Sequence, residues 1–411
     1  MPVKVLHIST CDHVGGSARS AYRIHQGLRA LGVRSRVLVG RQLTRDDDVA
    51  PIWTTRARYV SDRICGVLTD RVGLQDLFYP SSFALPRHPW FCDADVVQLY
   101  NLHGGYFSYP ALERLSRLKP IVWRLSDMWP MTGHCTYSYE CERWKTGCGA
   151  CPHLSDYPRL RVDTTALHWR LKRRVYAKGR FTIVAPSRWL AGLAAQSPLL
   201  GRLPLRVIPN GLDTAVFRPM PKPAARARVG LDARSRVLLF GAQSVQDRRK
   251  GLRLLEQALS RLPCDVVKEI VVLMVGASSG TEPLKSPCPV KGLGQVNDDE
   301  TMAAIYAAAD VCVVPALADN LPNVLVESLA CGTPAVAFRV GGIPEILRHM
   351  DTGYLAAPDA ADELAQGIMR LLSDEPLRLR LGQAGRRLVE AEHAQELQAR
   401  RYLELYREVS A

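Results

Sequence analysis

Several features that would place this 411-residue chain in a special class are missing from it. No run of about 18 consecutive apolar residues occurs, so the sequence predicts no transmembrane helix. The first ten residues turn polar too soon for a signal peptide and instead indicate a buried strand, so we expect a cytoplasmic protein. The chain also has no low-complexity tract and no short-period repeat. Disorder, collagen and coiled coil are therefore excluded as descriptions of the whole molecule.

The composition is that of an ordinary globular protein, with 47% apolar and 23% charged residues. A chain of this length exceeds one ordinary core and fits two domains of about 200 residues. Strand-like runs alternate with helical patterns, which indicates α/β domains built on parallel sheets. We expect a Rossmann-like domain over 1–205, a second one over 206–375 with a ligand cleft between them, and a helical segment over 376–411 that packs back on the first domain.

The expected elements follow from the apolar periodicity. The stretch 41–89 has weak periodicity and stays unassigned. Strands are predicted at 3–8, 35–39, 96–99, 120–124, 181–185, 205–208, 236–240, 270–275, 311–314 and 335–337. Helices are predicted at 18–31, 252–262, 299–308, 322–330 and 361–372.

The excess of positive over negative charge lies entirely in the first half. Residues 1–205 hold 29 Lys and Arg against 15 Asp and Glu, whereas residues 206–411 hold 25 of each, which together give the net charge of +14. Such asymmetry indicates that the first half meets something anionic: nucleic acid, phosphates or lipid headgroups. The densest basic run, 168–180, fits either a solvated helix face or a membrane-surface patch.

The 11 cysteines are an odd number, which disfavours a disulfide framework. Four of them, Cys135, Cys141, Cys148 and Cys151, lie within 17 residues. Four thiolates at such spacing can wrap one tetrahedral zinc ion, and a filled tetrahedron would make that ion structural rather than catalytic. Two local disulfides and four free thiols are the alternatives.

Two short basic or glycine-rich segments could bind phosphate. Gly15 and Gly16 follow the first strand and open a helix, where a ligand can approach the backbone and an anion is favoured. The full Gly-x-Gly-x-x-Gly fingerprint is absent, so a plain turn is the alternative. In the second half Arg249 and Lys250 end a loop before a helix, where they can neutralise a diphosphate without a metal; the alternative is a solvated basic turn.

The segment 319–334 combines two acids with a helix start and stop. Asn320 is a good N-cap, Pro322 suits a first turn, and Gly332 suits a stop. Asp319 then lies at the helix entrance, and Glu327 lies two turns in among apolar residues. A carboxylate there is costly unless something pairs with it, and sugar hydroxyls are natural partners.

These motifs together resemble the family 4 retaining glycosyltransferases. Asp319-x7-Glu327 followed by Ser-Leu-Ala-Cys-Gly-Thr-Pro is similar to the family's Glu-x7-Glu signature. The resemblance extends over nearly the whole chain, and the segments 127–135 and 320–323 are similar to enzymes of bacterial exopolysaccharide synthesis, including colanic acid transferases.

The resemblance implies the GT-B fold and a set of donor contacts. Arg249 and Lys250 would hold the diphosphate of a nucleotide sugar, Glu327 the ribose and Asp319 the transferred sugar. Backbone groups of Leu321, Pro322 and Asn323, with Asn320, would line the sugar–phosphate site. Gly15 and Gly16 would approach the diphosphate from the first domain. Stabilisation of the leaving diphosphate would need no catalytic metal.

The sequence departs from the family pattern at three places. Asp319 stands where the family usually has Glu, and Ala242 where many members have Arg. Ser126 stands before Asp127, where many members have a His near the reacting sugar. Ser126 and Asp127 are expected on the acceptor side, and His103 is the nearest replacement for the missing His; the alternative is a loop-capping or acceptor-side His.

The predicted reaction moves a sugar to an acceptor hydroxyl with retention of anomeric configuration, by same-face attack without a protein nucleophile. The expected acceptor is a polyprenyl-diphosphate-linked glycan at the inner membrane face, with the basic first half, including Arg170, Lys172, Arg173 and Arg174, docking on anionic lipid. Rival hypotheses are a catalytically impaired sugar-nucleotide-binding subunit, an epimerase or phosphorylase of the same fold, and a zinc-containing nucleic-acid-binding protein. We expect no nucleic-acid partner, because that hypothesis leaves the second half unexplained.

Overall fold

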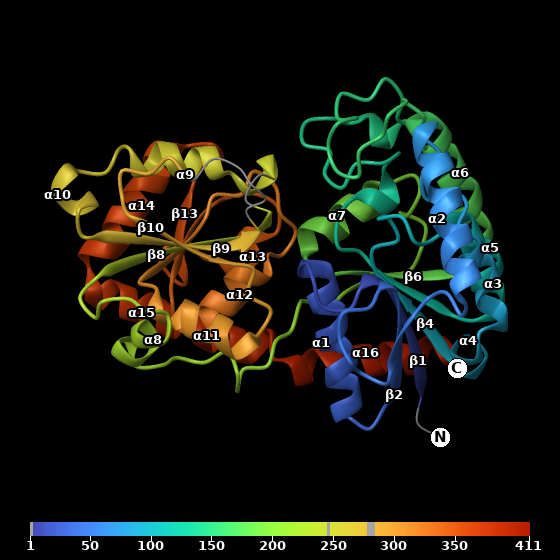
Figure 1. The fold of residues 1–411 in the computed structure, drawn as a ribbon, viewed down its shortest axis with the longest axis horizontal. Coiled ribbons are helices and arrows are strands. Elements are labelled where there is room, and N and C mark those ends of the chain that lie inside the picture. Colours follow the sequence, from blue (N-terminus) through green and yellow to red (C-terminus); the bar gives the residue numbers. More distant parts are fainter. Residues whose placement is uncertain (1–2, 245–246, 278–283) are drawn as a thin grey trace. The chain divides into compact units, whose positions relative to one another are not determined.

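The computed structural model describes residues 3–244, 247–277 and 284–411. The chain forms two compact units, one containing the chain up to Pro209 together with Gln398–Ala411, and the other containing Asn210–Leu397 (Figure 1). Both are parallel α/β sheets with helices on both faces.

The first unit contains a seven-stranded parallel sheet in the order β3-β2-β1-β4-β5-β6-β7. Because the order runs outward in both directions from β1 and β4, these two neighbours mark the point where the connections reverse. The strands are β1 (Lys4–Cys11), β2 (Arg34–Arg41), β3 (Val49–Pro51), β4 (Val96–Leu99), β5 (Ile121–Arg124), β6 (Phe181–Ala185) and β7 (Leu205–Val207).

Helices cover both faces of this sheet. On one face, α1 (Gly16–Ala30) and α16 (Gln395–Ser410) pack on alternate side chains of β1, β4, β5 and β6. The remaining side chains of the same strands meet residues of α4, α5, α6 and α7 in a larger core that contains Trp123 and Tyr176. The other helices are α2 (Arg56–Arg71), α3 (Pro80–Ala84), α4 (Pro89–Asp93), α5 (Leu112–Leu118), α6 (Thr165–Lys178) and α7 (Arg188–Gln196).

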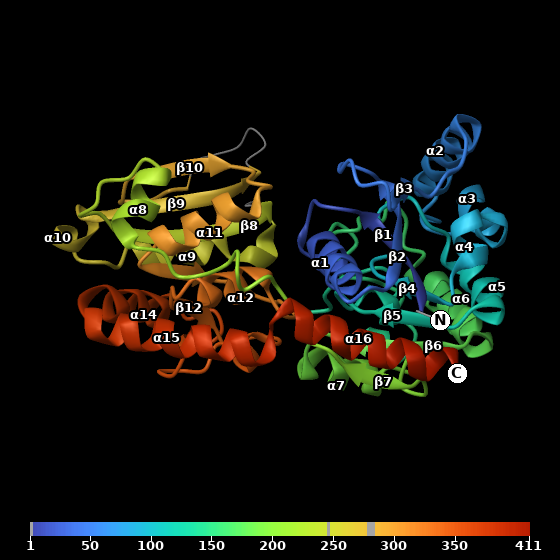
Figure 2. The same cartoon turned by 90° about the horizontal axis from the view of Figure 1, so that it is seen from below.

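The second unit contains a six-stranded parallel sheet in the order β10-β9-β8-β11-β12-β13, with its reversal point between β8 and β11. Two cores lie on its two faces, one with residues of α11, α12 and α15 and one with residues of α9 and α14. Figure 2 shows these helices around the sheet. The strands are β8 (Arg236–Ser244), β9 (Ile270–Ala277), β10 (Val290–Gly294), β11 (Val311–Val314), β12 (Ala335–Phe338) and β13 (Gly353–Ala356). The helices are α8 (Lys222–Arg228), α9 (Leu252–Leu259), α10 (Cys264–Val267), α11 (Asp299–Ala308), α12 (Asn323–Ala330), α13 (Ile343–Ile346), α14 (Ala361–Ser373) and α15 (Glu375–Glu392).

The helical segment 376–411, which the sequence predicts to pack back on the first domain, does so only in its last part. The structure divides 376–411 between two helices, and α15 packs against α12 and α14 inside the second unit. Only the chain from Gln398 onward joins the first unit, where the Tyr406 hydroxyl lies 3.0 Å from Gln98 Oε1. The unassigned stretch 41–89 contains β3, α2 and α3.

Candidate functional site

Arg249 and Lys250 come a few residues after the carboxyl end of β8, one of the two strands at the reversal point of the second sheet. They form a 3₁₀ turn, Arg248–Lys250, whose start is fixed by Asp247 Oδ1, which accepts a hydrogen bond from the Arg249 amide at 2.9 Å. The Leu317 amide donates to the Arg249 carbonyl at 2.8 Å, which ties this turn to the loop after β11. The loops that follow the neighbouring strands β8 and β11 are therefore hydrogen-bonded to each other.

Asp319 gathers the two cations. Lys250 Nζ lies 2.7 Å and Arg249 Nη1 3.1 Å from the same Asp319 oxygen, Oδ2. Burial by itself would raise the pKa of Asp319, but the charges of Lys250 and Arg249 outweigh it and hold that pKa below its usual value. Three residues that the sequence assigned to one site thus meet, and the acid positions both cations at the end of the sheet.

Glu327 is buried on α12, with 3% of its surface exposed. Its Oε2 accepts a hydrogen bond from the Tyr306 hydroxyl of α11 at 2.7 Å. The sequence argument required a partner for this carboxylate but did not identify Tyr306, because nothing in a helical pattern tells which neighbouring helix supplies a hydroxyl.

The start of α12 differs from the prediction in one respect. Asn320 is not the N-cap: the helix begins at Asn323, with Pro322 before it and no side-chain cap. The loop 320–323 is instead held by Asn210, whose Nδ2 donates to the Leu321 carbonyl at 3.1 Å and to Asn323 Oδ1 at 2.9 Å. Both Leu321 and Asn320 are buried.

In the first unit, Gly15, Gly16 and Ser126 also lie beyond the carboxyl ends of central strands. Gly15 has φ of +98° and is the residue before α1, so the backbone here adopts a conformation that favours glycine. The Ser17 and Ser126 hydroxyl oxygens lie 2.7 Å apart, which brings the loop after β5 against the start of α1.

His103 and Asp127 form a pair in the same place. His103 Nε2 lies 3.1 Å from Asp127 Oδ2, and Asp127 Oδ1 accepts from the Trp129 amide at 2.9 Å. The imidazole lies between the rings of Trp129 and Tyr157, with centroids 5.6 and 5.4 Å away. His103 Nδ1 is buried and makes no hydrogen bond to any residue that the structure describes. A histidine oriented by a carboxylate, with its other nitrogen available, can exchange a proton or a hydrogen bond with a ligand.

A cavity of about 420 Å³, which the sequence did not indicate, is lined by Gly104, next to His103 in the chain, and by Tyr157, whose ring packs against His103. Its wall includes Asp76, buried at φ of +61°, whose Oδ1 accepts from the Gly105 amide at 3.3 Å. Burial raises the pKa of Asp76 to about 6. The lining consists of polar and small residues: Asp62, Arg63, Gly66, Val67, Asp70, Gln75, Asp76, Tyr79, Gly104, Gly105, Tyr157, Pro158 and Arg159. The weakly periodic stretch 41–89 supplies much of this wall.

The predicted zinc site is not supported. Cys135, Cys141, Cys148 and Cys151 do line one small cavity together with His134. However, in the described part of the chain no three His, Cys, Asp or Glu side chains are arranged to hold a metal ion. The four thiols are free, and Cys148 and Cys151 accept hydrogen bonds from the amides of Gly133 and His153.

The prediction of a solvent-exposed basic patch on 168–180 is wrong for Lys172. Lys172 is fully buried inside the first unit, where Nζ donates to the carbonyls of Trp129 and Thr132 at 2.6 and 3.0 Å. Its ammonium lies 3.4 Å from the centroid of the Trp129 ring, and burial lowers its pKa to about 7. Residues at helical spacing share a face, and Lys172 lies on the same buried face of α6 as Trp169 and Tyr176.

Asp93 and Asp95, which lie just before β4, both bind the first strand. Asp93 Oδ1 pairs with Lys4 Nζ at 2.7 Å, and Asp95 Oδ2 accepts from the Lys4 amide at 2.8 Å.

In comparison with known proteins, both halves of the chain match glycosyltransferase family models. Residues 14–216 match the family model described as Glycosyltransferase Family 4, and residues 234–374 match that of Glycosyl transferases group 1. A D-inositol 3-phosphate glycosyltransferase of Catenulispora acidiphila is 34% identical over 223 residues, 49% of this chain and 53% of that protein. The putative colanic acid biosynthesis glycosyl transferase WcaC of Escherichia coli K12 is 25% identical over 62% of each chain. The chain spans about half the length of the curated relatives it matches.

Among solved structures, the Anabaena protein HepE in complex with UDP-glucose aligns with a TM-score of 0.67 at 17% identity, over 98% of this chain and 99% of that one. Likeness at this identity shows the fold alone, and the fold is GT-B. Within the described residues, none of the helices combines the length and apolar character needed to cross a membrane.

Proposed function

We propose that this chain, which belongs to the glycosyltransferases in both of its halves, transfers a sugar from a nucleotide diphosphate sugar to a glycan acceptor. The anomeric configuration of the sugar is retained in the proposed reaction. The observation that carries the donor part is the cluster at the carboxyl ends of β8 and β11. Two cations share one buried carboxylate there, in the position where parallel α/β sheets bind ligands.

Arg249 and Lys250 would bind the diphosphate and stabilise the charge that develops on it as the glycosidic bond breaks. Asp319, which already holds both cations, would also meet the transferred sugar. Glu327, fixed by Tyr306, would bind ribose hydroxyls. The solved neighbour HepE binds UDP-glucose, which makes a uridine nucleotide the first donor to test.

His103, oriented by Asp127, would take the place of the histidine missing at Ser126, and the cavity beside it would receive the acceptor. Its carboxylates suit sugar hydroxyls. A polyprenyl-diphosphate-linked glycan of surface or exopolysaccharide synthesis is the proposed acceptor, reached at an anionic membrane surface on the cytoplasmic side. The similarity to WcaC, a putative colanic acid biosynthesis glycosyl transferase, supports the polysaccharide part of this choice.

Thermal unfolding with UDP, GDP, ADP and their sugar conjugates tests the donor site. A ligand at 100 times its Kd adds about 2.7 kcal/mol to stability, a readable shift. We expect one diphosphate nucleotide to stabilise the protein, and Lys250→Ala and Glu327→Ala to remove the effect. Lys268→Ala, at an exposed lysine of the same unit, is the matched control. If DNA or RNA stabilises and no nucleotide does, the proposal fails.

Turnover separates an enzyme from an impaired sugar-nucleotide-binding subunit. With the stabilising donor and a polyprenyl-linked glycan, we expect nucleotide release coupled to product, whose anomeric proton coupling reports retention. His103→Ala should lower kcat by roughly 10²-fold or more while the donor Kd stays unchanged. Loss of donor binding in that variant would contradict the role given to His103.

A further inference from the structure

Helix α2 reverses the usual arrangement of a surface helix, because its buried side chain is polar and its large apolar side chains are exposed. The only buried side chain among its 16 residues is Asp62, whose Oδ1 accepts from the Ser81 amide at 3.0 Å. Its large apolar residues face solvent, with exposed fractions of 40–57%: Tyr59, Val60, Ile64, Val67 and Leu68, followed by Val72. A helix in water normally shows the opposite arrangement.

These exposed side chains form one stripe. Val60, Ile64, Leu68 and Val72 follow one another at four-residue intervals, which places them on a single face of the helix. Helix α3 contacts α2, and on the segment around it Phe78 and Phe83 are also exposed and pack together with ring centroids 5.8 Å apart. Half of the most exposed large apolar side chains in the described chain lie between residues 59 and 83. A patch this dense marks a contact surface.

Arginines accompany the stripe. Arg56, Arg63 and Arg71 are exposed, and within the described ranges none of them forms an ion pair. The acids of the helix are already engaged: Asp62 points inward, and Asp70 lies 3.4 Å from Arg161 Nε. The face that α2 presents is therefore apolar and positive.

The charge decides which partner fits. A symmetric contact with a second copy through this helix would bring the same arginines of both copies together, which disfavours it. An apolar face edged by arginines suits the plane of an anionic bilayer, where the aliphatic side chains enter the acyl boundary and the cations meet headgroup phosphates. Tyr59, which packs on Trp53 with centroids 4.8 Å apart, adds the aromatic type favoured at that boundary.

The position of α2 links this surface to the acceptor cavity. Its side at Asp62, Arg63, Gly66, Val67 and Asp70 forms part of the wall of the cavity described above, so Arg63 and Val67 lie where the exposed face meets the cavity (Figure 1 shows α2 at the margin of the first unit). A helix lying on the membrane would hold that cavity at the height of lipid-borne headgroups.

We propose that α2, extended by Phe78 and Phe83, is the surface by which this protein lies on an anionic lipid bilayer. The inference deepens the membrane association proposed above and rests on it. It replaces the basic run on α6, where Lys172 is buried, as the docking element.

Sedimentation of the full chain with vesicles tests the surface. Vesicles of phosphatidylglycerol with phosphatidylethanolamine supply the anionic bilayer, and phosphatidylcholine vesicles the neutral one. We expect salt-sensitive binding to the anionic vesicles, reduced at least about tenfold in Ile64→Ser/Leu68→Ser, because each side chain loses its apolar burial. Leu118→Ser/Leu379→Ser, at equally exposed leucines elsewhere, should bind like the parent.

A second pair of variants separates the charges. Arg56→Gln/Arg63→Gln/Arg71→Gln should also weaken binding, by about fivefold per arginine, whereas Arg170→Gln/Arg173→Gln/Arg174→Gln on α6 should not. Unchanged binding of the α2 variants, or equal loss in the control variants, overturns the inference. So does a soluble dimer of the parent that Ile64→Ser/Leu68→Ser converts to monomer, since a second copy would then cover the stripe.

Stabilisation by UDP, measured on the same samples, keeps the two proposals apart. If UDP stabilises all variants but vesicles bind none, the transferase proposal stands and the docking surface fails. If vesicles bind through α2 and no nucleotide stabilises the protein, the docking surface stands and the transferase proposal fails.

Discussion

At the scale of single residues, the second unit shows how charge is prepared before a ligand arrives. Asp319 is nearly buried, yet it remains ionised because Lys250 and Arg249 meet the same oxygen. The aspartate is one methylene shorter than the glutamate usual in this family. In this structure the shorter carboxylate of Asp319 still contacts both Lys250 and Arg249. An aspartate at this position is therefore compatible with a site whose cations are held by a carboxylate.

The hydroxyl of Tyr306 is expected to stabilise the fold through Glu327. Tyr306→Phe leaves a buried carboxylate oxygen without this donor, so the free energy of unfolding should fall by about 1–3 kcal/mol in urea titrations. Tyr354→Phe is the control, because in the described structure its hydroxyl makes no hydrogen bond. An equal, small effect of both variants would show that the bond to Glu327 contributes little.

At the scale of elements, the candidate donor site depends on loops that pass very close together. Gly341 has φ of +57°, and a Cβ there would lie 1.8 Å from the carbonyl oxygen of Asp319. The Gly342 amide donates to that same carbonyl at 3.2 Å. The loop after β12 therefore sets the position of the acid that holds both cations.

Gly341→Ala should displace Asp319. The positive φ alone costs about 1–2 kcal/mol, and the close contact adds to it. We expect a lower unfolding temperature together with loss of stabilisation by the donor nucleotide. Gly292→Ala in β10, where a Cβ meets nothing within 4 Å, should change neither. Normal nucleotide binding by Gly341→Ala would contradict the dependence of the site on this loop.

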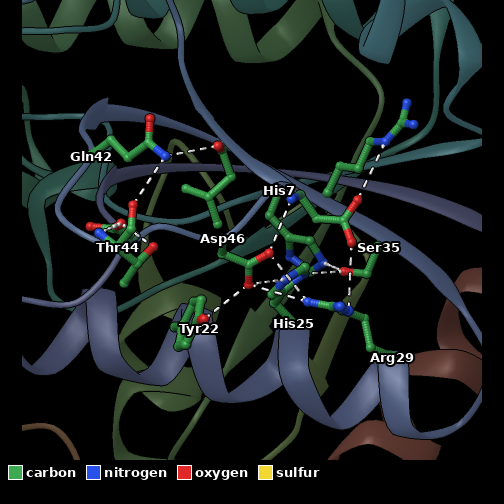
Figure 3. A network of polar contacts seen from close by, with 12 residues as sticks. His7, Tyr22, His25, Arg29, Ser35, Gln42, Thr44 and Asp46 are labelled. Atoms are coloured by element: carbon green, nitrogen blue, oxygen red, sulfur yellow. Dashed lines mark hydrogen bonds and ion pairs between the residues drawn. The ribbon is translucent and has the colours of Figure 1, made fainter. Parts of the chain in front are cut away.

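A buried network of histidines joins α1 to its sheet (Figure 3). His7 of β1 and His25 of α1 each bond to the hydroxyl of Ser35 of β2, at 2.9 and 2.8 Å. Burial lowers the pKa of His25 to about 4, against the opposing charge of Asp46. Burial also lowers the pKa of His7, with a further contribution from His25.

The direction of these shifts sets a pH dependence. Because the folded pKa of His25 lies below the unfolded value near 6.5, its contribution to stability is complete above pH 6.5 and is lost as the pH falls toward 4. Between pH 7 and 5 the loss is roughly 2 kcal/mol. Urea unfolding at several pH values measures it, and His25→Gln should reduce proton uptake on unfolding by about one. An unchanged pH slope in that variant would contradict a buried neutral His25.

At the scale of the whole molecule, the chain returns to its first unit at the end. Tyr402 and Tyr406 of α16 are fully buried in the core shared with α1 and the first sheet. We expect Tyr402→Ala to lower the free energy of unfolding by about 3–5 kcal/mol, as for other large buried side chains. Arg407→Ala, exposed on the same helix, should cost little, and calorimetry of the two variants compares them. Similar unfolding temperatures would show that α16 is dispensable for this core.

The sequence by itself determined the architecture and named the residues of the candidate donor cluster. Buried parallel strands are short continuous apolar runs, so β4, β6 and β11 were predicted at their observed bounds. Helix α11 was also predicted at its observed bounds, from its helical apolar periodicity. The basic loop, the two acids of 319–327 and the family resemblance that they carry pointed to Arg249, Lys250, Asp319 and Glu327, and the structure brings Arg249, Lys250 and Asp319 together.

Only the tertiary structure decided which residues meet across long sequence distances. The pairing of Glu327 with Tyr306, the Asp76 cavity and the inward turn of Lys172 depend on packing between elements, which a local pattern does not encode. The same holds for α2. Its apolar stripe gave weak periodicity in the sequence, and the fold shows that the stripe faces outward because the helix anchors itself through Asp62 instead.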